Sequence, residues 1–301
     1  MMMHDYHKPV LLKEAIDGLD IREGGVYVDA TFGGGGHSRS ILKHLAGGRL
    51  IAFDQDEDAI VNVPDDERIH FLHQNFRYMK NFLKYYGYLP VDGILADLGV
   101  SSHQLNEAER GFSSRYEGPL DMRMSQSSEK TAKNILNKYD AESLSNVFFL
   151  YGEIRQAKKL AEAVVLYRQQ RPLETTSQLI DILKPMVPAG RENKFFARVF
   201  QALRIEVNGE LDALKALLIQ SNEVLKTGGR LVVISYHSLE DRLVKNFMKA
   251  GNFEGKQEKD FFGRLIAPFK PVTKMITPGE QELRENPRSR SAKLRIAEKN
   301  Q

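Results

Sequence analysis

Residues Val26 to Ser38 read VYVDATFGGGGHS, and this stretch decides the fold. A short β-branched run ends at the acid Asp29, four consecutive glycines follow, and a helical pattern then begins. Glycines adopt positive φ and let the backbone approach a ligand closely, while the first N–H groups of a helix supply donors and a positive dipole end. The pattern predicts a nucleotide-like ligand site, and a tight loop that only packs a helix on a sheet is the alternative.

A second strand, Leu50–Asp54, also ends in an acid, about 20 residues past the turn, which suits a carboxylate that binds a ribose. A dinucleotide site wants a third glycine, for close helix packing, where this chain has Ser38. Asp29 would repel a pyrophosphate but attract the ammonium group of S-adenosylmethionine (SAM). We therefore favour SAM over a dinucleotide. The phosphate-binding pattern G-x-x-x-x-G-K-[ST] is absent, which argues against an NTPase.

Short apolar runs alternate with helical patterns in the first hundred residues, and this alternation predicts a parallel sheet. From 105 to 199 the periodicity is helical, and a further strand follows at 230–236. We expect an α/β fold, a Rossmann-like domain of residues 1–104 and 200–301 interrupted by a helical insertion of residues 105–199. The four predicted strands before the insertion are 26–30, 50–53, 69–72 and 93–97, with helices at 37–45 and 78–86.

The composition of the chain limits where the protein is expected in the cell and which reactions it can catalyse. The 301 residues carry a net charge of +3 and are 42% hydrophobic, without an apolar run long enough for a membrane span. No signal peptide is evident, so we expect a cytoplasmic protein with no membrane partner. The chain has no cysteine, which excludes disulfides, thiolate metal sites and the cysteine nucleophile that methylation at pyrimidine C5 ordinarily uses. A methyltransferase of this composition should act on nitrogen or oxygen.

Three further residues are candidates for catalysis. Asp97 ends the fourth predicted strand, where open parallel sheets bind their ligands, although a turn carboxylate is the simpler interpretation. Tyr236 and His237 end the strand after the insertion and offer a stacking face and a proton carrier, with a structural turn histidine as the alternative. The acidic run that begins at Asp54 resembles a calcium loop but has Ala59 where glycine is required, so we expect no metal.

The segment from Pro287 to Arg295 is basic and rich in hydroxyl groups, as suits a phosphate-binding segment, and a solvated tail is the alternative. Its four cations are candidate RNA contacts: Arg288, Arg290, Lys293 and Arg295.

These motifs, in this order, resemble the RsmH (MraW) family of bacterial small-subunit rRNA (cytosine-N4)-methyltransferases. The run GPLDMRM at Gly118–Met124 and the run NPRSRSAKLR at Asn286–Arg295 are far more specific than a glycine turn. The other matching stretches are His7–Leu12, Asp29–His37, Asp92–Ser102, Arg110–Ser113, Phe200–Ile205 and Ser235–Arg242.

The resemblance implies a SAM-dependent enzyme that methylates the exocyclic N4 of a cytidine in small-subunit (16S) rRNA, with the rRNA or the 30S particle as partner and a possible homodimer. Residues implied to bind SAM are Gly34, Gly35, Gly36, His37, Asp54, Phe76, Asp97 and Gln104. At Gly34 the family often has arginine, which should cost little because the backbone does the binding. A non-catalytic RNA-binding protein and an NAD-dependent oxidoreductase are the competing classes.

Overall fold

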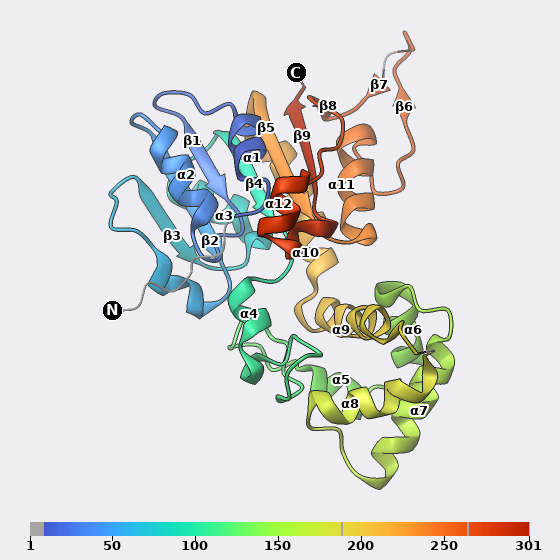
Figure 1. Ribbon diagram of the computed structural model, residues 1–301. Helices are drawn as coiled ribbons and strands as arrows, with labels where there is room; N and C mark the ends of the chain where they lie inside the picture. Colours follow the sequence, from blue (N-terminus) through green and yellow to red (C-terminus); the bar gives the residue numbers. More distant parts are fainter. Residues whose placement is uncertain (1–8, 188, 264, 301) are drawn as a thin grey trace. The chain divides into compact units, whose positions relative to one another are not determined.

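The computed structural model describes residues 9–187, 189–263 and 265–300, so that His7 and Lys8 of the first motif lie outside the described residues. The chain divides into two compact units (Figure 1). Unit 1 comprises the residues up to Gly99 and those from Leu211 onward, and unit 2 comprises Val100–Glu210. None of the described helices is both long enough and apolar enough to cross a membrane.

Both unit boundaries differ from the expected positions at 105 and 199. Position 199 falls inside α9 (Glu192–Asn208), a continuous helix whose residues on both sides of it, including Phe196 and Leu203, are buried in the core of unit 2. At the other boundary, Val100 and Leu105 pack against that same core. Helical periodicity locates the segments, but only the packing of their side chains assigns each one to a core.

Unit 1 is built on a seven-stranded sheet with the strand order β3-β2-β1-β4-β5-β9-β8. The first five strands in sequence are parallel to one another, and β9 is antiparallel to both β5 and β8. The strand bounds are β1 Val26–Asp29, β2 Arg49–Asp54, β3 Ile69–His73, β4 Val91–Asp97, β5 Leu225–Ser235, β8 Phe269–Pro271 and β9 Lys293–Lys299. The predicted parallel strands are thus confirmed.

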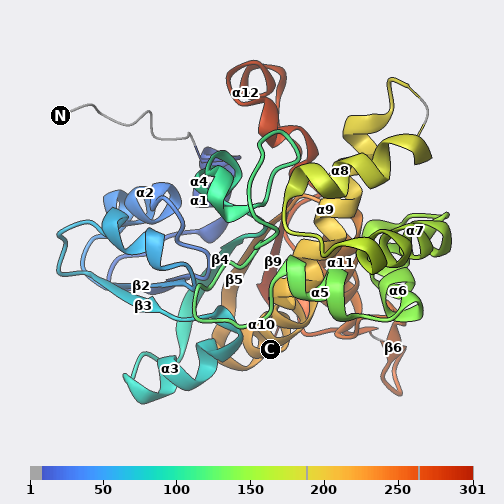
Figure 2. The ribbon, with the colours of Figure 1, turned by 90° about the horizontal axis from the view of Figure 1, so that it is seen from below.

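Helices cover both faces of this sheet (Figure 2). Alternate strand residues face opposite cores, as in β4, where Ile94 and Ala96 contribute to one cluster and Leu95 to the other. The first cluster is covered by α3 (Met79–Tyr85), α10 (Glu210–Val224) and α11 (Ser238–Ala250). The second is covered by α1 (Leu12–Leu19) and α2 (Gly36–His44). Unit 1 is therefore a three-layer α/β/α structure.

The C-terminal basic segment forms a strand that the sequence analysis did not predict. It is not the solvated tail given as the alternative, because it continues into β9, an interior strand between β5 and β8. Its alternating apolar residues, Leu294 and Ile296, are buried in the cluster with α1 and α2, while Ala297 faces the other cluster. The basic side chains conceal this strand pattern because they occupy the alternate positions. Between α11 and β8, the short strand β6 (Glu258–Lys259) pairs with β7 (Leu265–Ile266), and α12 (Glu280–Glu285) follows later in the chain.

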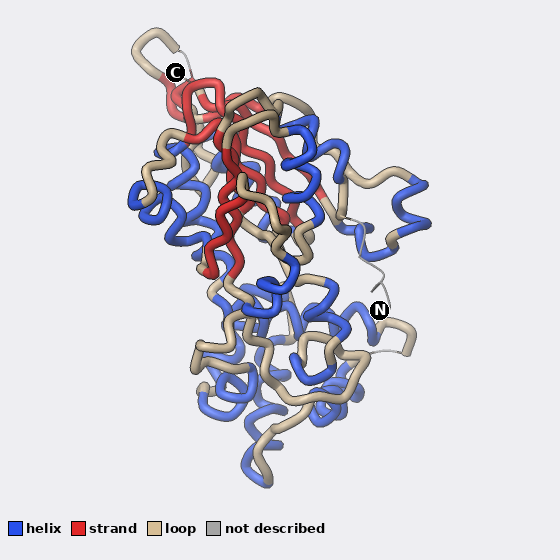
Figure 3. The backbone as a smooth tube through the Cα atoms, turned by 90° about the vertical axis from the view of Figure 1, so that its left-hand side faces the viewer, coloured by secondary structure: helices blue, strands red, loops and turns tan. Residues whose placement is uncertain are grey.

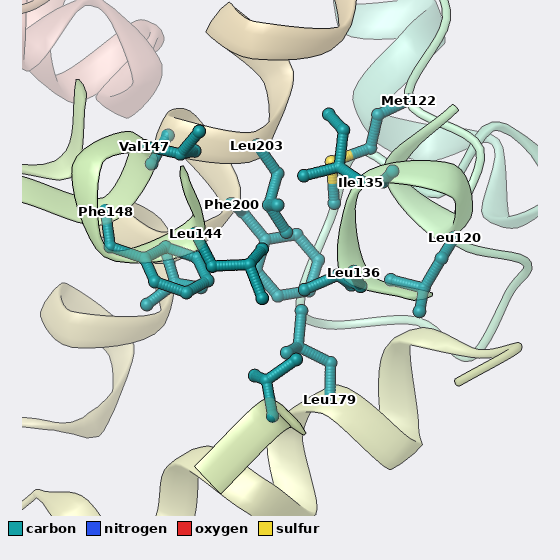
Figure 4. Close-up of a cluster of buried hydrophobic side chains, with 14 of the residues drawn as sticks. Leu120, Met122, Ile135, Leu136, Leu144, Val147, Phe148, Leu179, Phe200 and Leu203 are labelled. Atoms are coloured by element: carbon teal, nitrogen blue, oxygen red, sulfur yellow. The ribbon is translucent and has the colours of Figure 1, made fainter. Parts of the chain in front are cut away.

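Unit 2 is helical over its described residues, as the tube in Figure 3 shows. Its apolar core gathers side chains from most of its helices and from the loop Leu120–Met124 (Figure 4). The helix bounds are α4 Ser102–Asn106, α5 Ala132–Lys138, α6 Ala141–Gly152, α7 Ala157–Gln170, α8 Thr176–Leu183 and α9 Glu192–Asn208.

Candidate active site at the carboxyl edge of the sheet

Three aspartates lie at the carboxyl ends of adjacent strands in unit 1. Asp29 ends β1, Asp54 ends β2 and Asp97 ends β4, and β1 pairs with both of the other strands. Because these strands are parallel, their carboxyl ends meet at one edge of the sheet, which is where open α/β sheets bind ligands. The sequence-predicted acids are therefore gathered at one edge.

The glycine turn forms a backbone cradle at this edge. Gly33 and Gly35 have φ of 51° and 73°, in the left-handed region that favours glycine. A Cβ on Gly36 would lie 2.2 Å from Cγ of Pro9, whereas a Cβ on Gly33 would meet no atom within 4 Å. No side chain caps the following helix α2, so its first N–H groups are available to a ligand. The turn thus has open space, donors and a positive helix end.

Asp54 fastens this turn. Its Oδ2 accepts the backbone N–H of Gly33 at 2.7 Å, and its Oδ1 accepts the N–H of Asp56 at 2.8 Å. Burial raises the pKa of Asp54 to about 6 in spite of these hydrogen bonds. The side chain is only partly buried, so a carboxylate oxygen can still accept hydroxyl groups of a ribose.

Asp29 has a structural role that its sequence position does not reveal. It is 1% exposed, its Oδ2 accepts the hydroxyl of Ser38 at 2.6 Å, and its Oδ1 accepts the N–H of Thr31 at 3.1 Å. Burial raises its pKa. Ser38, which replaces the third glycine of a dinucleotide fingerprint, thus ties α2 to the end of β1. Asp29 contributes negative potential to the site from beneath the turn.

Asp97 lies among several polar groups. Its Oδ1 accepts the hydroxyl of Tyr236 at 2.8 Å, its Oδ2 lies 3.7 Å from Nδ1 of His37, and its N–H donates to Oγ1 of Thr31 at 2.6 Å. Burial raises the pKa of Asp97 to about 6, and His37 and Tyr236 act against this shift. A carboxylate with this pKa can exchange a proton near neutral pH.

Tyr236 and His37 each present a defined side-chain group to Asp97. Burial raises the pKa of Tyr236 well above its usual value, and the neighbouring Asp97 adds to this effect, so the phenol stays a donor. Nε2 of His37 lies 3.1 Å from the carbonyl oxygen of Val10, which can only accept. Nε2 therefore carries a hydrogen, and Nδ1 faces Asp97.

The side chain of His237 bonds to α11 and not to Asp97. It is the N-cap of α11, where its Nδ1 accepts the N–H of Glu240 at 3.4 Å. The Oε2 of Glu240, a buried side chain, accepts the N–H of Tyr236 at 2.9 Å. The structure thus brings Tyr236, but not His237, to Asp97. Glu240 was not predicted from the sequence, although its position three residues after an N-cap is the signal of a capping box.

Phe76 and Gln104 are the two remaining residues that the resemblance implies for the cofactor. Phe76 starts the 3₁₀ turn Phe76–Tyr78 after β3 and is half-buried, so part of its ring can pack on a ligand. Gln104 belongs to α4 of unit 2, where it is buried and its Oε1 accepts the N–H of Ser101 at 3.0 Å. Its side chain completes the capping box of α4.

The C-terminal cations fall into two pairs. Nζ of Lys293 and Nε of Arg295 donate to the carboxylate of Asp241 at 3.2 and 2.7 Å. Burial acts to raise the pKa of Asp241, but the two cations hold it below its usual value. Arg288 and Arg290 are exposed on the 3₁₀ turn Pro287–Ser291. Asp241 thus neutralises part of the positive charge that the segment carries in the sequence.

Comparison with known proteins extends over nearly the whole chain. The profile of the MraW methylase family matches residues 4–300. The chain is 53% identical over 300 residues to the ribosomal RNA small subunit methyltransferase H of Christiangramia forsetii, covering 99% of each protein. It is 57% identical over 297 residues to the protein of the same name from Parabacteroides distasonis, covering 98% of this chain and 97% of that protein. Among solved structures, an rRNA methylase from Streptococcus thermophilus aligns over 100% of both chains, with a TM-score of 0.42 and 13% identity.

Proposed function

The chain belongs to the MraW methylase family, and from this premise we propose that it transfers the methyl group of SAM to the exocyclic N4 of a cytidine in small-subunit rRNA. The observation that carries the proposed chemistry is the placement of Asp97 and Tyr236 at the carboxyl edge of the sheet, beside the glycine turn. Asp97 there has the position and the pKa that removal of a proton from an amine requires.

The residues at this edge fit SAM. Asp29, Asp54 and Asp97 make the site acidic, which suits the ammonium and sulfonium groups of SAM and disfavours a pyrophosphate. We assign the ribose hydroxyls to Asp54, the methionine end to the N–H groups of Gly34–His37, and the adenine to Phe76. When bound, SAM would supply an electrophilic methyl group, and breaking its sulfur–methyl bond would leave neutral S-adenosylhomocysteine.

Asp97 would act on the nucleophile. The lone pair of cytosine N4 is delocalised into the ring, so the amine must be oriented and must lose a proton as the N–C bond forms. The carboxylate of Asp97 accepts a hydrogen bond from one N4–H, and this turns the lone pair of N4 toward the methyl group. The same carboxylate then takes that proton. The Tyr236 hydroxyl fixes the Asp97 carboxylate and stays protonated throughout. His237 acts only through α11, as its cap.

We extend the proposal to the partners. Arg288 and Arg290 contact phosphates of the rRNA, and unit 2 binds further nucleotides of the same rRNA. An rRNA substrate implies a cytoplasmic enzyme, whose natural substrate is the rRNA within a 30S particle. The homodimer stays a prediction.

Nucleoside mass spectrometry tests the reaction. Purified protein, SAM and unmethylated 30S particles should yield N4-methylated cytidine, and rRNA from cells that lack the protein should have lost it. Methyl label recovered only as 5-methylcytidine, or only on a ribose hydroxyl, would contradict the assignment. RNA binding without consumption of SAM would show a non-catalytic protein.

A further inference from the structure

A second part of unit 1 carries aromatic rings on the surface, away from the three aspartates. Tyr78, Tyr85 and Tyr86, on and beside α3, are 48%, 81% and 43% exposed. Figure 2 shows α3 at the lower left of unit 1, on the opposite face of the sheet from α2. Exposed aromatic residues in such a group need a reason, because burying them would contribute to stability.

The rings are supported by one another. Tyr85 meets the ring of Tyr86 edge-on, with centroids 4.9 Å apart. Tyr86 in turn contacts His70 at 4.4 Å and stacks on Tyr88 at 6.2 Å, while Nδ1 of His70 lies 3.0 Å from the hydroxyl of Tyr88. We name these four residues the tyrosine platform: His70, Tyr85, Tyr86 and Tyr88. Tyr85, the most exposed ring of the four, thus packs edge-on against Tyr86 and leaves most of its own surface open to a ligand.

The surrounding charge is positive. Between Glu67 and Asp92 the chain has no acidic residue, although Asp and Glu number 40 of its 301 residues. Lys84 is exposed next to Tyr85, and Lys80 and Arg77 lie in the preceding turns. One of these charges is partly neutralised, since Nζ of Lys80 is 2.8 Å from the carboxylate of Glu223 on α10.

Exposed aromatic rings beside exposed cations match single-stranded nucleic acid. Bases stack on aromatic rings whatever their sequence, and lysine and arginine contact the backbone phosphates. We propose that the tyrosine platform, which lies against the amino-terminal half of β3, binds a single-stranded part of the RNA, with a base stacked on Tyr85. This inference rests on the proposed function, because that function supplies the RNA.

The surface lies near the cofactor site along the chain. Tyr78 follows Phe76 by two residues, and Tyr78 and Tyr85, seven residues apart, are separated by about 10 Å along the helix. An RNA strand that contacts both Tyr85 and Tyr78 would follow α3 toward Phe76, the residue that we assign to adenine.

Three variants of one residue test the proposal. Tyr85→Ala and Tyr85→Leu should each weaken the binding of fluorescein-labelled single-stranded oligocytidine about tenfold or more in fluorescence anisotropy, whereas Tyr85→Phe, which keeps the ring, should stay within about twofold. Tyr85→Leu separates stacking from simple apolar contact. With 30S particles as substrate, the first two variants should raise KM and leave kcat unchanged. SAM affinity, measured by calorimetry, should not change.

The outcomes separate the two proposals. If wild-type protein methylates N4 and all three variants bind RNA equally well, the platform is not an RNA site and the proposed function stands. If wild-type protein makes no N4-methylated cytidine, the proposed function fails, while anisotropy still decides whether the platform binds RNA. If Tyr85→Ala turns a dimer into a monomer in sedimentation without changing RNA affinity, the platform is a contact between copies of the chain, and the inference is wrong.

Discussion

The acids at the two ends of the unit 1 sheet differ in whether they have a cationic partner. At the amino end, Asp92 accepts Nζ of Lys226 at 2.8 Å and also the N–H of Val26, so its charge is paired. At the carboxyl end, Asp54 and Asp97 have no lysine or arginine partner among the described residues, and burial raises the pKa of both to about 6. Removing a carboxylate from water without a lysine or arginine partner destabilises a fold. The carboxyl end therefore gives up stability to hold a negative potential ready for a cationic ligand, and the amino end does not.

The sharpest test of this comparison is the loss of the carboxyl-end base. Asp97→Asn keeps an oxygen for the Tyr236 hydroxyl but cannot take a proton, so kcat at saturating SAM should fall about 100-fold or more. The matched change at the amino end, Asp92→Asn, should leave kcat within about twofold. Equal losses in both variants would show that the fall reports folding and not proton transfer.

Cofactor affinity is the next largest effect. Asp54→Ala removes the carboxylate assigned to the ribose and the acceptor that fastens Gly33, so SAM affinity should fall about tenfold or more. Calorimetry on the folded variant measures this, with Asp92→Ala as the control. Unchanged affinity in Asp54→Ala would remove Asp54 from the site.

Stability should move in the opposite direction from activity. Folding raises the pKa of Asp97 from 3.8 to about 6, so the folded chain binds its proton more tightly than the unfolded chain does. This acid therefore lowers the free energy of unfolding progressively as pH rises from about 4 to 6, and the loss is complete above pH 6. Asp97→Asn should accordingly stabilise the ligand-free protein at pH 7 by about 1–2 kcal/mol, and Asp92→Asn should destabilise it. Denaturant unfolding at pH 4 and pH 7 measures both, and a destabilised Asp97→Asn protein would refute the comparison.

The smallest effect concerns the two pairs of C-terminal cations. Arg288 and Arg290 are exposed, whereas Lys293 and Arg295 bond to Asp241. The variant Arg288→Ala with Arg290→Ala should weaken RNA binding about two- to five-fold and flatten its salt dependence. Lys293→Ala with Arg295→Ala should change the salt slope less, although it leaves Asp241 unpaired. Equal salt slopes of RNA binding in both variants would mean that the bonds to Asp241 do not keep Lys293 and Arg295 from contacting RNA.

Local patterns were sufficient for much of the fold and part of the site. The four parallel strands, the glycine turn and the helix after it follow from apolar runs and glycines within about a dozen residues of one another, and the structure confirms them. The same patterns placed Asp54 and Asp97 at strand ends. They failed at β9, where basic side chains at alternate positions hid the buried face of an interior strand.

What the sequence by itself determined is the set of elements and the charge at their ends, because backbone preference and burial periodicity are local properties. Only the tertiary structure decided which side chains meet. The Tyr236 hydroxyl donates to Asp97 across 139 residues of chain. The role of Ser38 is visible only in its hydrogen bond to Asp29, and Asp241 accepts hydrogen bonds from Lys293 and Arg295. Such contacts depend on strand order and on the packing of helices against the sheet. No periodicity within one segment records these arrangements, so the partners of each charge, and therefore its pKa and its chemistry, emerge only in the folded chain.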